Sequence, residues 1–168
     1  MIAGDRVRVM VSVAVPPDEA FRVFTDELDA WWQRGPRFRI AGADRGFIRL
    51  EPGIGGRLFE SFERRGTTTV IDTGRVVEWT PPARLVFTWR ASNFGPDEVT
   101  TVEVDFAPTA SGTQVTVTHH GFAALPADHP VRHGADVPTF VRRMGMWWGD
   151  LASSLRLHVA RTRDTLAP

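Results

Sequence analysis

Hydrophobic and polar residues alternate strictly near the start of the chain, over residues 5–15 (DRVRVMVSVAV). The valines of this stretch share one face: Val7, Val9, Val11, Val13 and Val15. A period of two with β-branched side chains is typical of a strand that has one well-buried face. The pattern therefore predicts a strand over residues 5–15, which the two prolines that follow it end.

The pattern becomes helical directly after this strand. Pro17 suits the first position of a helix, and the acidic residues Asp18 and Glu19 suit its first turn. Apolar residues then recur at helical spacing: Ala20, Phe21, Phe24, Leu28 and Trp31. We expect a helix over about 17–27 and a second short turn through Trp31 and Trp32, so that two short helices cover about 17–32.

Six segments in the middle of the chain have the composition of strands. They lie at about 46–51, 56–64, 67–79, 83–91, 98–107 and 112–120. The breaks between them are short and rich in Gly and Pro, such as PGIGG, TPP and SNFGP. Short breaks of this kind favour antiparallel hairpins over parallel crossovers.

A helical pattern returns at Val137 and continues to about residue 163. Its apolar side chains recur with a period of 3.6: Phe140, Val141, Met144, Trp148, Leu151, Leu155 and Val159. Asp136 is well placed to be the N-cap. The order of elements predicts one α+β domain over residues 1–168, in which a curved antiparallel sheet of about seven strands wraps around a long C-terminal helix. The gap between sheet and helix is either filled by side chains or left as a pocket.

Composition excludes several classes of function. The 20 acidic and 20 basic residues cancel, which gives no electrostatic reason to expect nucleic acid or an anionic membrane as partner. The chain has no Lys, hence no Schiff-base or phosphate-loop lysine, and no Cys, hence no disulfide or thiolate chemistry. No segment approaches the ~20 apolar residues of a membrane span, and the first strand is too alternating for a signal peptide. We therefore expect a cytoplasmic protein.

Several segments resemble one known family, in the order in which they occur there. VVEWTPPARLVFTW (76–89) is similar to the central signature of the SRPBCC, or START-like, superfamily. FRVFTDELDAWW (21–32), LEPGIGGRLFE (50–60) and GTQVTVTHHGF (112–122) are similar to its branch related to the activator of the heat-shock protein 90 ATPase, in the bacterial single-domain form. The resemblance covers nearly the whole chain and implies the helix-grip fold. It implies no single function, because members bind lipids, hormones or polyketides and some are catalysts.

Four of the five histidines lie between residues 118 and 134. His119 shares a strand face with the valines at 115 and 117, so it should point inward and His120 outward. His129 and His133 are four residues apart, but Pro130 between them indicates a loop or a single turn. A zinc site would need three inward-facing ligands, so we expect no metal and no cofactor. We expect His120, His129 and His133 to face water.

Glu60 is the second candidate polar group. Leu58, Glu60 and Phe62 share one face of the strand predicted over 56–64, and if this face is inward, Glu60 faces the gap under the helix. A buried carboxylate needs a partner, which His119 or Arg75 could supply. Two interpretations stay open: Glu60 and His119 are convergent polar groups of a ligand pocket, or they form a structural hydrogen bond that closes the sheet edge.

Aromatic side chains complete the predicted site. Trp89 should face inward, at least one of Trp147 and Trp148 should face the sheet, and Trp31 and Trp32 lie near the expected mouth of the gap. The predicted ligand-binding set is Trp31, Trp32, Leu58, Glu60, Phe62, Phe87, Trp89, His119, Phe140, Met144, Trp147, Trp148 and Leu151.

Three functions are compatible with these observations. The first is binding of a small hydrophobic or aromatic molecule in a cavity between sheet and helix. The second is an enzyme of the cyclase, dehydratase or hydrolase type, with Glu60 and His119 as acid and base. The third is a co-chaperone of a heat-shock ATPase, which we expect least because the family's activator has a further N-terminal domain and this chain begins at the first strand. Many such folds form dimers, so a homodimer is a further expectation.

Overall fold

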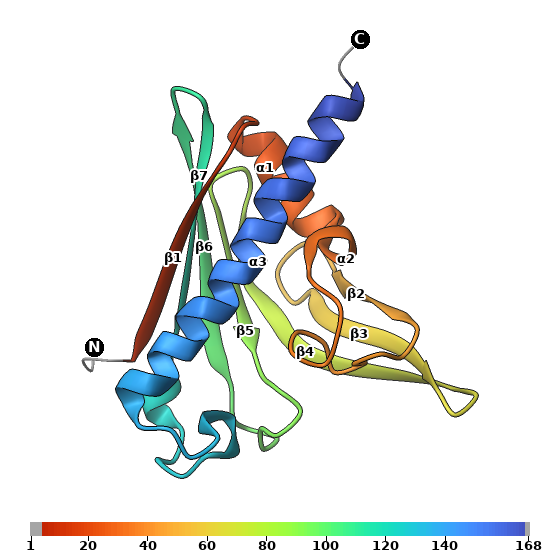
Figure 1. Ribbon diagram of the computed structural model, residues 1–168, viewed down its shortest axis with the longest axis vertical. Helices are drawn as coiled ribbons and strands as arrows, with labels where there is room; N and C mark the ends of the chain where they lie inside the picture. The colour runs from red at the N-terminus through yellow and green to blue at the C-terminus, as the bar shows by residue number, and fades with distance from the viewer. Residues whose placement is uncertain (1–4, 167–168) are drawn as a thin grey trace.

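The computed structural model describes residues 5–166 and has the α+β helix-grip architecture that the sequence predicts. Its strands form one antiparallel seven-stranded sheet in the order β1-β7-β6-β5-β4-β3-β2, and the long helix α3 lies along the sheet (Figure 1). The strands are β1 Arg6–Val13, β2 Gly46–Leu50, β3 Arg57–Arg64, β4 Thr67–Thr80, β5 Arg84–Trp89, β6 Thr100–Thr109 and β7 Gly112–His120.

The helices also follow the predicted order. They are α1 Pro17–Asp26, α2 Leu28–Trp31 and α3 Val137–Leu166, with two short 3-10 helices, η1 Phe122–Ala124 and η2 Pro130–Arg132, between β7 and α3. The predicted cap of α3 is confirmed, because Oδ1 of Asp136 accepts a hydrogen bond of 2.9 Å from the backbone N–H of Thr139. The sequence did not predict η1 and η2, which are too short to produce a periodic pattern.

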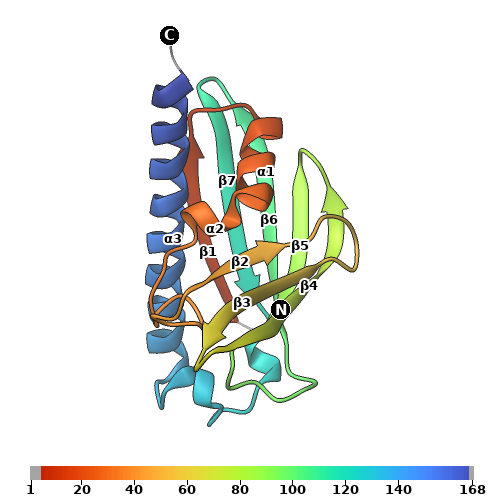
Figure 2. The same cartoon turned by 90° about the vertical axis from the view of Figure 1, so that its right-hand side faces the viewer.

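The register of the sheet places the two candidate polar residues on β7 and β3, each the second strand from one edge of the sheet. His119 of β7 pairs with Val7 of β1 on one side and Val102 of β6 on the other. Glu60 of β3 lies between Ile48 and Ile71 of the neighbouring strands. Register shifts in the β3–β4 and β4–β5 pairs increase the local twist. Figure 2 shows the result: β2 and β3 turn away from the direction of β6 and β7 and cross toward α3.

The hydrophobic core fills the space under α3 from the middle of the helix toward its C-terminal part. Trp148, Leu151, Leu155 and Val159 are buried there against β1, β7 and the two short helices. A smaller cluster lies under the start of α3 and consists of Phe94, Phe122, Leu125, Val131 and Phe140. Side chains thus fill the gap between the sheet and the middle of α3, and hollows open beside its N-terminal half and at its C-terminal end.

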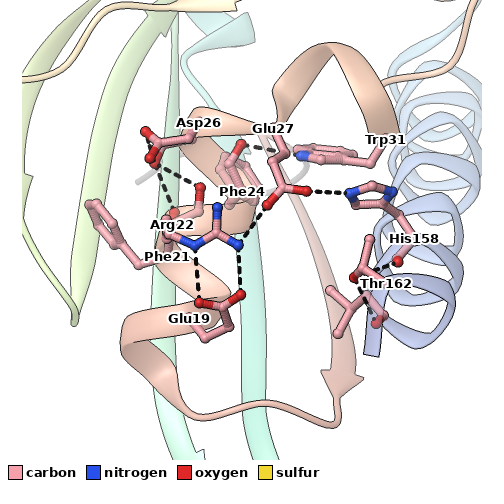
Figure 3. Close-up of polar contacts among 11 residues, drawn as sticks. Glu19, Phe21, Arg22, Phe24, Asp26, Glu27, Trp31, His158 and Thr162 are labelled. Atoms are coloured by element: carbon pink, nitrogen blue, oxygen red, sulfur yellow. Dashed lines mark hydrogen bonds and ion pairs between the residues drawn. The ribbon is translucent and has the colours of Figure 1, made fainter. Parts of the chain in front are cut away.

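A chain of ion pairs and hydrogen bonds fastens α1 and the α1–α2 junction to α3 (Figure 3). The guanidinium group of Arg22 lies 2.6 Å from Glu19 and 2.7 Å from Glu27. Oε1 of Glu27 is in turn 2.8 Å from Nε2 of His158 on α3. These contacts hold the last turns of α3 in place. None of the helices within residues 5–166 is long and apolar enough to cross a membrane.

Candidate functional site

A cleft of about 620 Å³ opens between the N-terminal half of α3 and the β2–β5 side of the sheet. Its walls come from the end of α2 and the loop after it, from β3, from the end of β5, and from η2 and α3. The large apolar side chains in these walls are Trp32, Phe38, Trp89, Phe140, Met144 and Trp147. Both the volume and the aromatic lining are typical of a site for a small organic molecule.

Four of these rings, Trp32, Phe38, Trp89 and Trp147, form what we call the aromatic wall. Trp147 is its centre: Phe38 stacks on it at a centroid distance of 5.9 Å, and Trp32 and Trp89 contact it edge-on at 5.6 and 6.0 Å. The indole N–H of Trp147 donates to the carbonyl oxygen of Arg37 at 2.8 Å, and that of Trp32 donates to Phe38 at 3.0 Å. Because the indole N–H groups of Trp32 and Trp147 already have partners, these two rings are held in place at the cleft.

Glu60 faces inward as predicted, but its predicted partners are wrong. The side chain is 3% exposed, and its two oxygens accept hydrogen bonds from the backbone N–H groups of Ile40 at 2.8 Å and Ala41 at 3.1 Å. His119 bonds elsewhere, and the exposed Arg75 instead pairs with Asp72. The loop after α2 folds back over β3 and brings its own donors to the carboxylate. Glu60 therefore anchors the loop that carries one side of the cleft.

His119 points inward as predicted and is fully buried. Its Nδ1 accepts a hydrogen bond of 3.0 Å from the indole N–H of Trp148. An indole N–H can only donate, so Nδ1 carries no proton and the proton of the neutral ring is on Nε2. Nε2 lies 2.7 Å from Oγ1 of Thr100, which donates onward to the carbonyl oxygen of Trp89 at 3.0 Å. Both ring nitrogens are thus used within the protein.

Electrostatics agree with this assignment. Burial, with a smaller contribution from the neighbouring charge of His120, lowers the pKa of His119 to about 3. A neutral, fully buried imidazole has no nitrogen to offer to a substrate. The hydrogen bonds of His119 thus form a structural network that joins β6, β7 and α3. This agrees with the structural interpretation of His119, except that its partners are Thr100 and Trp148 and not Glu60.

The remaining histidines of the 118–134 segment differ from one another. His133 is exposed, and His120 lies on the outer face of β7 with Nε2 3.1 Å from Glu103. The prediction that His129 faces water is wrong: it is 4% exposed, and its Nε2 lies 2.8 Å from Glu98. The loop folds onto Phe94, whose ring is 4.9 Å from that of His129. Within residues 5–166, His, Asp and Glu form no group of three that could hold a metal ion.

The structure divides the predicted ligand-binding set into two groups. The cleft is lined by Trp32, Leu58, Glu60, Trp89, Phe140, Met144 and Trp147. The others are core residues that do not line it: Trp31, Phe62, Phe87, His119, Trp148 and Leu151. Phe38 and the arginines of the lining, above all Arg90 and Arg132, were not predicted from the sequence. Most of these lie in segments without regular structure, where neither period applies. Ligand binding by any of these residues stays a prediction.

A second hollow of about 700 Å³ lies between α1 and the C-terminal end of α3. It is lined by aliphatic side chains and by charged ones, including Glu19, Arg22 and Glu27, which pair with one another (Figure 3). No aromatic residue is among its lining residues in the described part of the chain. The cleft beside the aromatic wall is therefore the better candidate for a functional site.

A curved antiparallel sheet that grips a long helix, with a cleft beneath the helix, defines the START-like class of domain. Residues 14–138 match the family described as Activator of Hsp90 ATPase homolog 1-like protein, and the chain belongs to this family. No curated protein matches the sequence.

Solved structures of the same fold come from several sources. A protein from Nitrosomonas europaea shares 19% identity and superposes with a TM-score of 0.65, with 96% of this chain and 98% of that chain covered. A protein of unknown function from Staphylococcus aureus has 16% identity, 95% coverage of both chains and a TM-score of 0.67. A putative protein in the dynemicin biosynthetic locus has 25% identity and a TM-score of 0.59, and the match covers 93% of this chain and 47% of that one. The first two similarities show the fold alone.

Proposed function

We propose that the protein binds a small apolar or aromatic molecule in the cleft beside the aromatic wall. One observation carries the proposal: rings from the segment after α2, from β5 and from α3 are fixed around an opening of about 620 Å³ instead of closing it. A protein interior normally packs without voids of this size, so apolar surface left around an opening favours a ligand site.

The family and one structural neighbour are consistent with this proposal. Binding of small organic ligands is common in the START-like class, as the sequence resemblance implies. One neighbour is a putative protein in the dynemicin biosynthetic locus. The chain's formal net charge of zero also favours a small molecule over nucleic acid. The homodimer and the cytoplasmic location stay predictions from the sequence.

The enzymatic alternative loses the pair of residues on which it depended. The two oxygens of Glu60 accept backbone N–H groups of one loop, and the two nitrogens of His119 are bonded to Trp148 and Thr100. General acid–base catalysis needs a group within hydrogen-bond reach of the reacting atoms, and His119 is fully buried. No contact in the described residues specifically favours co-chaperone activity.

Thermal unfolding in the presence of a ligand panel tests the proposal. The panel contains lipids, aromatic acids and their esters, and polyketide-like compounds. A ligand present at 100 times its Kd stabilises the folded state by about 2.7 kcal/mol, which raises the Tm of a domain of this size by roughly 5–10 °C.

A variant that fills the cleft gives the test its control. Met144→Trp places a larger ring in the cleft and should abolish the ligand-induced rise in Tm. Leu157→Trp adds the same ring on the exposed side of α3 and should leave the rise intact. If no compound raises Tm, or if both variants respond alike, the cleft is not a binding site.

A further inference from the structure

The charged groups of the cleft are strongly unbalanced. Its lining contains five arginines and a single carboxylate, that of Glu60. Both oxygens of the Glu60 carboxylate already accept hydrogen bonds from backbone N–H groups. Two of the arginines have carboxylate partners behind the lining: Arg37 pairs with Asp150, and Arg39 pairs with Asp29. The remaining three contribute positive charge to the cleft.

These three are Arg90, Arg132 and Arg143, and none of them forms an ion pair with a carboxylate within residues 5–166. Arg90 donates its hydrogen bonds to backbone carbonyl oxygens of the loop at 94–96. Arg143 is exposed on α3 at the edge of the cleft. Arg132 differs from both, because it is buried.

Arg132 of η2 is only 6% exposed and has few partners for a buried cation. Its Nη2 donates to the carbonyl oxygen of Phe122 at 2.9 Å, and its guanidinium group lies 5.5 Å from the centre of the Phe140 ring. Its Nε is the one buried side-chain nitrogen or oxygen without a hydrogen-bond partner in the described part of the chain. A buried guanidinium group with one neutral acceptor is costly, and removal of a buried charge often stabilises a fold. Stability alone therefore does not account for Arg132.

The position of Arg132 relates this charge to the aromatic wall. Phe140, which its guanidinium group covers, also lines the cleft, and Arg143 and Met144 follow on α3 three and four residues later. Residues at this spacing share one face of a helix. The cleft thus has a cationic end at η2 and the start of α3, which continues directly into its apolar part.

We propose that the cleft takes an amphiphilic anion, an aromatic or apolar carboxylic acid whose carboxylate binds the guanidinium group of Arg132. The inference rests on the proposed binding function of the same cleft and specifies the chemical class of the ligand. A guanidinium group presents N–H donors in the planar arrangement that a carboxylate accepts in a bidentate manner. The carboxylate supplies the partner that Nε lacks, Arg90 and Arg143 add to the attraction, and the apolar body contacts the aromatic wall.

Matched acid and ester pairs test this proposal. The compounds are 2-naphthoic acid with methyl 2-naphthoate, and decanoic acid with methyl decanoate, titrated at neutral pH by calorimetry. We expect at least one acid to bind the wild-type protein tenfold or more tightly than its ester. Arg132→Met should weaken binding of that acid at least tenfold and leave binding of the ester within twofold. Arg156→Met, which removes an exposed arginine of α3 outside the cleft, should change neither affinity.

The outcomes separate this proposal from the proposed function. Equal binding of acid and ester by the wild-type protein would refute the proposal that the ligand is an anion, and would leave the proposed binding of an apolar molecule intact. If Arg132→Met weakens the binding of acid and ester equally, the anion proposal is refuted as well, because Arg132 would then only support the structure of the cleft. If neither acid binds while a neutral compound does, the anion is again excluded, and if nothing in the wider panel binds, both proposals fail. Should Arg132→Met not fold, Arg132→Lys must lower the acid preference without changing ester affinity.

Discussion

The buried network of His119 predicts how the protein responds to acid. In the folded protein His119 is neutral and its pKa is lowered to about 3, chiefly by burial. In the unfolded chain a histidine has a pKa of about 6.5. The unfolded state therefore binds a proton as the pH falls below about 6.5, and the folded state does not. The contribution of His119 to stability is complete above this pH and declines as the pH falls toward about 3.

The size of the effect follows from the two pKa values. Each pH unit between them changes the free energy of unfolding by about 1.4 kcal/mol. Between pH 7.5 and pH 4.5, which lies two units below the unfolded pKa, His119 should thus cost the folded state about 2.7 kcal/mol. For a domain of this length, that corresponds to a decrease in Tm of roughly 5–10 °C.

The assay compares the wild-type protein with His119→Gln. Glutamine offers an acceptor oxygen and a donor NH₂ group in place of the acceptor and donor nitrogens of the neutral imidazole, but does not titrate. Urea unfolding at pH 7.5 and 4.5 gives the loss of free energy for each protein. The wild-type protein should lose about 2.7 kcal/mol more than the variant, since all other titratable groups are common to both. His133→Gln, at an exposed position, should behave like the wild type.

Equal losses in the wild type and in His119→Gln would refute the reasoning. So would an NMR titration of the folded protein in which the ring of His119 takes up a proton near pH 6.5. Either result would mean that the side chain is reached by water, and the acid–base role considered for it would have to be reopened.

Five further substitutions, at four positions, test individual contacts of the fold. Glu60→Gln turns an amide N–H₂ toward one of two backbone donors and should lower the free energy of unfolding by about 1–3 kcal/mol in urea, with weaker ligand binding because the loop is released. Asp136→Ala should remove the cap of α3 and lower the Tm, and Asp136→Asn, which keeps an acceptor oxygen, should lower it much less. The advantage of Asp over Asn should shrink at acid pH, because hydrogen bonds from the Thr139 side chain and backbone N–H lower the pKa of Asp136. Gly74→Ala should prevent normal folding, as judged by circular dichroism, since its Cβ would clash with the backbone carbonyl oxygen of Thr88 on β5. Gly145→Ala, with open space around it on α3, should instead raise the free energy of unfolding by up to about 1 kcal/mol.

Residues in regular elements were the ones whose orientation the sequence could predict. The period of two placed Glu60 and His119 on the inner faces of β3 and β7, and both are buried. The helical period likewise identified the stripe of α3 that packs on the sheet, from Phe140 to Val159. In these elements the backbone geometry alone determines which side chains share a face.

The partners of these residues could not be predicted, because they come from segments without a period. Glu60 is bonded by the loop after α2, and His129 is buried because its loop folds onto Phe94. No spacing in the sequence says where such a loop returns to the sheet. The same reason explains why Arg132, in the loop between β7 and α3, was not recognised as part of the cleft.

The distinction between core and cleft also depended on packing in three dimensions. Trp147 and Trp148 are adjacent on α3, yet Trp148 is buried against His119, and Trp147 belongs to the aromatic wall. Trp31 and Trp32 divide in the same way, with only Trp32 in the lining. The sequence identified a set of aromatic side chains around one gap, and the positions of α2 and α3 decide which of them a ligand could reach.

The indole N–H signals of the six tryptophans provide the most direct test of the cleft as a binding site. In a ¹⁵N-resolved NMR titration with the compound that raises Tm most, the signals of Trp32, Trp89 and Trp147 should shift in proportion to occupancy. Those of Trp31 and Trp79, which do not line the cleft, should stay in place. Shifts confined to Trp31 or Trp79, or no shift at saturating ligand, would contradict the account.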